Sequence, residues 1–177
     1  MSIRKICVVA LGIALFVALS LCLQVPVFEN YYLCLGYVVM AVYCYSFGPW
    51  AGMAVGSLGV VLYCLLISGL RGMPGWAAGN LVIGAAMGLC VRRTRKLEKP
   101  ALRWAVDAGV IVLATAVGIL GVKSLLEFVL YAQPVWFRMT KNSYAFVADV
   151  VLLLVSLPLC RRLDGVLHKC FSKLTEA

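Results

Sequence analysis

The stretch Arg92-Arg93-Thr94-Arg95-Lys96-Leu97-Glu98-Lys99-Pro100-Ala101-Leu102-Arg103 carries six cations and separates two long apolar runs. Two smaller basic groups lie near the ends of the chain, Arg4-Lys5 and a C-terminal group of Arg161, Arg162, Lys169 and Lys173. Basic residues beside membrane spans mark the cytoplasmic side. An even number of spans must therefore separate each group from the next, which predicts a polytopic membrane protein with both termini in the cytoplasm.

The composition supports a membrane protein. Hydrophobic residues make up 64% of the 177 positions and charged residues 13%, which leaves too little polar surface for a typical soluble domain. The net charge of +9 lies at the ends of apolar runs, where it attracts anionic lipid headgroups, and no basic stripe interleaved with aromatic residues suggests nucleic acid. We therefore expect membrane lipids, and no nucleic acid, as partners.

The apolar runs divide the chain into six spans, because a span needs about 20 largely apolar residues. We predict one all-α transmembrane domain over residues 1–177, with a polar, aromatic loop at 133–143 and a basic tail at 161–177. The fifth span is longer than a bilayer requires, so we expect it to bend near Gly118 and Gly121 or to protrude. The predicted spans are 6–23, 31–47, 50–69, 76–91, 104–131 and 144–160.

Small residues recur at four-residue spacing, the pattern that lets helices pack closely in lipid. We interpret the glycine series as packing within the chain: Gly48, Gly52 and Gly56, then Gly84 and Gly88. A second series, Ala10, Ala14 and Ala18, lines one face of the first span. This face serves either packing within the chain or contact with another membrane protein.

Polar and aromatic residues gather in the half of the protein away from the basic groups. Ionisable residues inside a span are costly and indicate function by default. Lys123 and Glu127 share a helix face, either as a self-neutralising pair or as part of a site, whereas Asp107 is expected to neutralise Arg103. Flat heterocycles bind where aromatic faces and a few polar groups converge. The predicted substrate-binding residues are Glu29, Asn30, Tyr37, Trp76, Asn80, Lys123, Glu127, Trp136, Asn142 and Asp149.

Metal and cofactor chemistry find no support in the sequence. The eight cysteines are scattered singly and read as small hydrophobic residues, and His168 is the only histidine. We therefore expect no metal, no cofactor and no catalytic residue. An intramembrane enzyme is disfavoured, because the sequence contains no paired-aspartate motif, no HExxH and no Ser/His constellation.

The chain resembles the substrate-binding (S) components of energy-coupling factor (ECF) vitamin transporters, most closely their riboflavin-type branch. The first helix reads Ala14-Leu-Phe-Val-Ala18-Leu-Ser, similar to the small-xxx-small signature of that family. The turn Gly48-Pro49-Trp-Ala-Gly52 and the run Gly75-Trp-Ala-Ala-Gly-Asn80-Leu-Val-Ile-Gly84-Ala-Ala-Met-Gly88 are similar to its second to fourth helices. The resemblance covers the first half of the chain well. In the second half, only the arrangement of the spans is similar.

The resemblance implies a subunit of the bacterial cytoplasmic membrane that captures a vitamin or related heterocyclic micronutrient at its outer side. It implies no ATPase activity in the chain itself. The alanine series Ala10, Ala14 and Ala18 would dock on a transmembrane coupling subunit driven by two cytoplasmic ATPases, and the S component would topple to deliver substrate inward. The alternative from the residues is a small membrane scaffold or assembly protein, which would use the small-residue faces for contacts alone.

Overall fold

Helices dominate the computed structural model, which describes residues 3–22, 25–28, 31–67, 69–70 and 72–175. Two short strands interrupt the helices after the first one. In chain order the elements are α1 (Ile3–Cys22), β1 (Val25–Phe28), β2 (Tyr31–Leu33), α2 (Gly36–Phe47), α3 (Pro49–Leu66), α4 (Met73–Thr94), α5 (Pro100–Thr115), the π-helical segment η1 (Ala116–Lys123), α6 (Ser124–Tyr131) and α7 (Val135–Thr175).

Within the described residues, five continuous helical stretches are long and apolar enough to cross a membrane, and the shorter α2 is also apolar. Together, these five stretches and α2 correspond in order to the six predicted spans. The predicted second span was too long, because 31–33 forms a strand and α2 has 12 residues. Such a helix is about 18 Å long, shorter than the roughly 30 Å hydrocarbon core, so α2 alone does not cross a bilayer.

The segment that follows α1 was expected to be a loop, yet its described parts form an antiparallel hairpin of β1 and β2. Val25 pairs with Leu33 and Pro26 with Tyr32, and the register is irregular between Pro26 and Phe28. Valine and aromatic residues favour strands, and a proline is tolerated where one edge of a strand is unpaired. The fold is therefore helical with one small hairpin.

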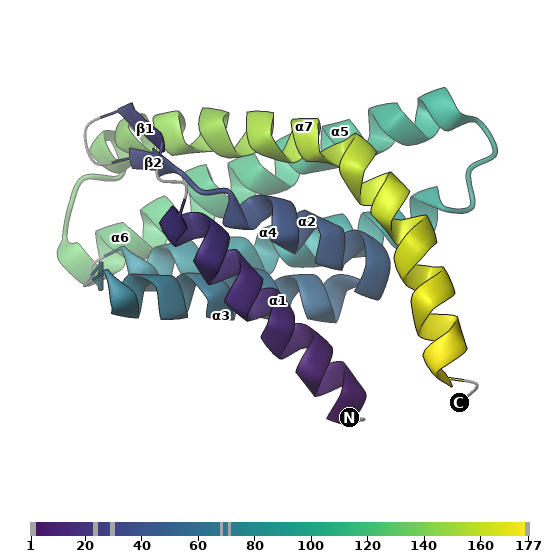
Figure 1. Ribbon diagram of the computed structural model, residues 1–177. Helices are drawn as coiled ribbons and strands as arrows, with labels where there is room; N and C mark the ends of the chain where they lie inside the picture. The colour runs from purple at the N-terminus through teal and green to yellow at the C-terminus, as the bar shows by residue number, and fades with distance from the viewer. Residues whose placement is uncertain (1–2, 23–24, 29–30, 68, 71, 176–177) are drawn as a thin grey trace.

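The last helix also departs from the prediction. The expected loop at 133–143 is helical from Val135, and α7 runs through the predicted tail to Thr175. The polar residues of this segment did not signal a loop, because 135–157 contains neither glycine nor proline. Pro158 lies inside α7, and the helix changes direction in this region (Figure 1). Proline removes a backbone donor and is a common cause of such a bend.

The long fifth span, by contrast, changes its helical geometry where the sequence predicted a bend. The π-helical segment η1 contains both Gly118 and Gly121 and joins α5 to α6 without a break. A Cβ atom at Gly79 would lie 2.7 Å from the carbonyl oxygen of Gly118. The two backbones of α4 and η1 therefore meet at a pair of glycines.

The glycine series packs within the chain, as predicted. A Cβ atom at Gly84 would lie 2.8 Å from the backbone nitrogen of Met53, and one at Gly88 would overlap Cα of Pro49. Both contacts join α4 to α3. The turn between α2 and α3 is made by Gly48, whose φ of 87° favours glycine.

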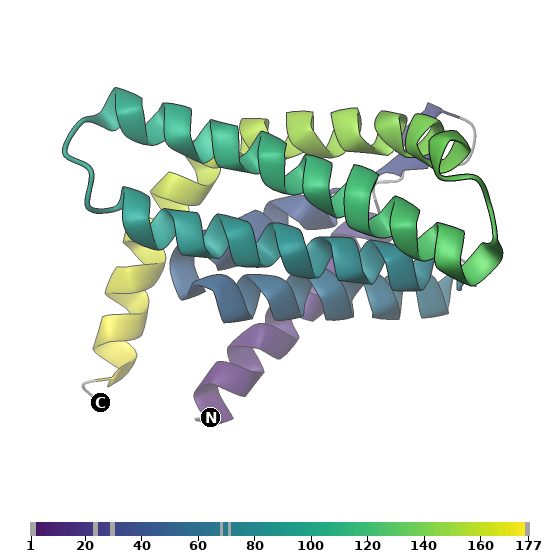
Figure 2. The same ribbon diagram turned by 180° about the vertical axis from the view of Figure 1, so that it is seen from behind.

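The elements meet at two distinct ends of the bundle. The basic end comprises the α2–α3 turn at Gly48, the α4–α5 loop and the part of α7 around Arg161; the polar end comprises the hairpin, the α3–α4 connection and the α6–α7 connection (Figure 1). Both chain termini lie toward the basic end in this view. Helix α1 runs obliquely across α2 and α3, and its N-terminal part extends beyond the bundle. Seen from behind, α4 and α5 form the opposite face (Figure 2).

Candidate substrate site at the polar end

A chain of hydrogen bonds connects α2, α3 and α4 near the polar end. The Trp76 Nε1–H group donates to the Tyr37 hydroxyl at 2.9 Å, and that hydroxyl donates to Asn80 Oδ1 at 2.8 Å. Asn80 Nδ2 in turn donates to the carbonyl oxygen of Gly56 at 3.0 Å. Tyr37 and Asn80 are fully buried, so the chain fixes the positions of polar groups within an apolar interior.

Aromatic rings pack beside this series of hydrogen bonds. The Tyr63 ring meets Trp76 edge to face, with centroids 5.8 Å apart, and Phe16 lies 6.4 Å from Tyr37. Trp76 is only half-buried, whereas Phe16 and Tyr63 are buried. Trp76 therefore keeps part of its surface accessible while its N–H group is held by Tyr37.

A second polar cluster joins α6 to α7. Asn142 Nδ2 donates to Ser124 Oγ at 3.0 Å and to Glu127 Oε2 at 3.2 Å. The Arg138 guanidinium pairs with Glu127, with Nε and Oε2 3.7 Å apart. Asn142, Ser124 and Glu127 are buried, so three polar side chains meet where a membrane helix would otherwise present apolar ones.

Lys123 and Asp149 connect the two clusters electrostatically. The Asp149 carboxyl group interacts with the Tyr37 hydroxyl and with the charge of Lys123. Lys123 also interacts with Glu127 and Arg138. Residues from α2, α4, η1, α6 and α7 thus form one network of interactions.

Two buried acceptors near the polar end have no hydrogen-bond partner within the described residues, Asn142 Oδ1 and Gln133 Oε1. Most buried polar atoms in proteins do have a partner, so an unpaired one requires an explanation. Asn142 Oδ1 belongs to the side chain whose amide nitrogen anchors the α6–α7 cluster. An additional donor, from water or from a bound molecule, would complete its hydrogen bonding.

Seven of the ten predicted substrate-binding residues belong to this network: Tyr37, Trp76, Asn80, Lys123, Glu127, Asn142 and Asp149. Trp136 does not, because its side chain is 81% exposed. Glu29 and Asn30 lie outside the described residues. Both alternatives for Lys123 and Glu127, a self-neutralising pair or part of a site, stay open, and Glu127 also pairs with Arg138.

Sequence reasoning missed Arg138, Ser124 and Tyr63 as members of the network. Arg138 was assigned to a loop, although its position four residues before Asn142 places both on one face of a helix. Ser124 directly follows Lys123, and Tyr63 lies in an apolar run without a polar neighbour to single it out. The spacing could have revealed Arg138; the other two depend on tertiary packing.

The alanine series of α1 lies on the side of the helix that the bundle leaves uncovered. Ala10, Ala14 and Ala18 are exposed, as are Leu11 at 59% and Leu15 at 44%. Gly12 and Phe16, on the other side of α1, are buried against α2 and α3. Of the two interpretations of this series, packing within the chain is therefore wrong for the described residues.

The basic end contains a separate cluster centred on Asp107 of α5. Its carboxylate accepts hydrogen bonds from Arg161 at 2.8 Å, Tyr45 at 2.8 Å and Thr94 at 2.9 Å. The expectation that Asp107 neutralises Arg103 was wrong. Asp107 is buried and faces α2, α4 and α7, and Arg161 of α7 reaches it from across the bundle.

Two comparisons with known proteins bear on this arrangement. The family model described as "ECF-type riboflavin transporter, S component" matches residues 1–164. The chain belongs to this family. It is also 30% identical over 180 residues to a UPF0397 protein of Vibrio atlanticus (strain LGP32), covering 99% of this chain and 98% of that protein.

Membership confirms the resemblance drawn from Ala14–Ala18 and the glycine-rich helices and extends it over the second half of the chain. This member of the ECF-type riboflavin transporter S component family is a membrane protein and a transporter subunit. S components bind a small-molecule substrate, associate with an ECF module and are in general non-enzymatic. The polar network therefore lies in a protein whose family function is substrate binding.

Proposed function

We propose that this protein is the high-affinity capture subunit of an ECF-type importer, and that the polar end is its substrate site. The observation that carries the proposal is the convergence of Tyr37, Trp76, Asn80, Asn142 and Asp149 from three helices, α2, α4 and α7. Membership of the S component family supports it independently. Burying amides and charges within a membrane costs free energy, so a cluster of them indicates a functional site.

The ligand class follows from the chemistry of the site. Half-buried Trp76 offers an aromatic face, and Asn142 Oδ1 offers an unpaired acceptor. Lys123, Asp149 and Glu127 offer charges of both signs. A flat heterocycle with N–H donors and polar substituents matches this combination, because it stacks on an aromatic face while its edge is hydrogen-bonded. We therefore propose a vitamin or related heterocyclic micronutrient, with Glu29, Asn30 and Trp136 as further candidates from the sequence.

The orientation follows from the charge distribution. We place the basic end, with Arg92, Arg93 and Arg161, at the cytoplasmic side and the polar end outside. We further propose six crossings of a bacterial cytoplasmic membrane with both termini inside, the second of them made by α2 together with the segment that precedes it. Cysteine accessibility in intact cells tests it, in a variant whose native cysteines are replaced by serine. A cysteine introduced at exposed Trp136 should react with an impermeant maleimide from outside, and one at exposed Lys96 should not.

The exposed alanine series suggests the route of delivery. We propose that Ala10, Ala14 and Ala18 dock on a transmembrane coupling subunit whose two cytoplasmic ATPases supply the energy. Small side chains allow another helix to approach closely, which is how helices associate in lipid. The exposure of the whole face supports contact with a second membrane protein.

The decisive experiment measures ligand binding by the purified protein. Mass spectrometry of protein purified in mild detergent should reveal a co-purifying heterocycle, and that compound should raise the melting temperature in a panel of vitamins. Asn142→Leu should abolish the shift, whereas Asn142→Gln should retain part of it. If no compound shifts the melting temperature and the partner that co-purifies lacks ATPases, the scaffold alternative is favoured and the capture function is rejected.

A further inference from the structure

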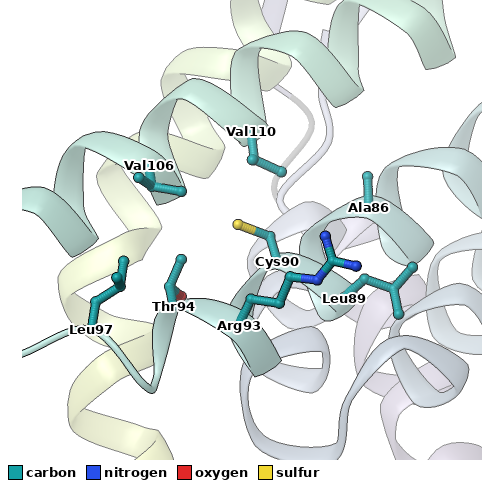
Figure 3. Close-up of a pocket in the computed structure, with 8 residues that line it drawn as sticks. All are labelled: Ala86, Leu89, Cys90, Arg93, Thr94, Leu97, Val106 and Val110. Atoms are coloured by element: carbon teal, nitrogen blue, oxygen red, sulfur yellow. The ribbon is translucent and has the colours of Figure 1, made fainter.

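A groove of about 480 Å³ lies between α4 and α5 at the basic end (Figure 3). Its volume is within the range of roughly 300–1,000 Å³ that ligand pockets occupy. Its walls are mainly apolar and include Leu89, Leu97, Val106 and Val110. This groove is remote from the polar-end network, because it is built from the opposite ends of the helices.

The groove belongs to the face that α1 does not cover. In the view from behind, α4 and α5 lie in front and α1 behind (Figure 2). Leu89, which lines the groove, is 54% exposed, and Leu113 of α5 is 67% exposed. Exposed leucines on a membrane protein contact acyl chains, so the groove opens to lipid rather than to the surface that we assign to the coupling subunit.

Positive charge lies where the groove meets the end of α4. Arg93 lines it, and its guanidinium group extends beside Leu89 and Cys90 (Figure 3). None of the residues that line the groove is acidic. Two acidic residues of the basic end pair with other arginines, Asp107 with Arg161 and Asp164 with Arg95, and Arg93 lines the groove.

We propose that this groove binds an anionic phospholipid, with an acyl chain along Val106 and Val110 and the phosphate on Arg93. Basic pockets between membrane helices on the cytoplasmic side are suited to anionic headgroups. Arginine pairs with phosphate through two parallel hydrogen bonds. A free phosphate would satisfy Arg93 but would gain nothing from the apolar walls, whereas a lipid uses both parts.

The proposal is tested by lipid binding to the purified full-length protein. Native mass spectrometry and thermal unfolding in detergent compare phosphatidylglycerol with phosphatidylcholine of the same chain composition. Wild type should bind phosphatidylglycerol more tightly and melt at a higher temperature with it. Arg93→Gln should reduce that affinity about fivefold, the effect of one surface cation. The matched control is Arg162→Gln, which removes an exposed cation of α7 outside the groove and should change little.

A second variant tests the contribution of the apolar walls separately from that of the charge of Arg93. Val106→Phe fills the groove and keeps every cation, so it should weaken phosphatidylglycerol binding while its melting temperature in phosphatidylcholine stays near that of wild type. Equal binding of the two lipids by wild type would overturn the proposal. So would an equal loss in Arg93→Gln and Arg162→Gln, or full stabilisation by inorganic phosphate alone.

Discussion

The Asp107 carboxylate accepts a 2.8 Å hydrogen bond from the Arg161 guanidinium, three residues after Pro158 in α7. The same guanidinium lies 4.1 Å from the centre of the Trp104 ring. Arg161 is therefore held by α5 from two sides where α7 changes direction (Figure 1). These two contacts connect the part of α7 that follows Pro158 to α5.

Asp107→Ala is expected to lower the free energy of unfolding by about 3–5 kcal/mol, because it leaves the partly buried Arg161 without its counter-ion. The hydroxyl groups of Tyr45 and Thr94 lose an acceptor as well. The matched control is Asp164→Ala, which removes the more exposed ion pair with Arg95 and should cost about 0–1 kcal/mol. Unfolding in mixed micelles with increasing SDS measures both; equal losses would contradict a special role for Asp107.

Tyr37→Phe is expected to weaken substrate binding by about tenfold or more. The change leaves the Trp76 N–H group without its acceptor and Asn80 Oδ1 without its donor, a cost of about 1–3 kcal/mol. Calorimetry with the ligand identified by mass spectrometry measures the affinity.

Tyr43→Phe is the control for this change, because it removes a hydroxyl from the same helix. That hydroxyl donates to the carbonyl oxygen of Val8 at 2.9 Å, away from the polar end. Ligand affinity should stay within twofold of wild type, an energy difference below about 0.5 kcal/mol. An affinity loss in Tyr43→Phe as large as that in Tyr37→Phe would indicate a general packing effect and reject the site.

Gly84→Val should destabilise the protein by at least about 1–3 kcal/mol, because even a Cβ atom would overlap the backbone of Met53. Gly109→Ala is the opposite case, since nothing lies within 4 Å of its Cβ position in α5. That change should stabilise the helix by up to about 1 kcal/mol. Thermal unfolding in detergent distinguishes the two. A neutral Gly84→Val would show that α3 and α4 are not in close backbone contact.

The sequence predicted the helical fold, the position of the basic groups at one end of the bundle and most of the polar network. Each of these depends on a local pattern of residues. Spacing placed Trp76 and Asn80 on one face of α4, and only their burial and partners required the fold. Asp107 shows the limit of this reasoning. Four-residue spacing suggested Arg103, but the side of α5 that carries Asp107 faces the bundle, where Arg161 arrives from 54 residues away.

The hairpin and the length of α7 were missed for a different reason. A continuous apolar or mixed run fits several local structures, and the choice depends on contacts elsewhere in the chain. Tyr31–Leu33 pairs with Val25–Phe28 instead of extending α2. In α7, Arg138 and Asn142 contact Glu127 and Ser124, so a segment that seemed too polar for a span packs as part of the bundle.

Replacing Ala14 and Ala18 of α1 by tryptophan is expected to abolish transport and leave substrate affinity unchanged. Both alanines are exposed, so the larger side chains fit in the isolated protein but prevent close approach of a partner helix. Leu113→Trp is the matched control, because Leu113 is 67% exposed on α5, a helix on the other side of the bundle from α1 (Figure 2). Uptake of labelled substrate in cells, together with calorimetry on the purified variants, separates the two steps. Lost binding in a folded Ala14/Ala18 variant, or lost transport in Leu113→Trp, would show that α1 is not a dedicated docking face.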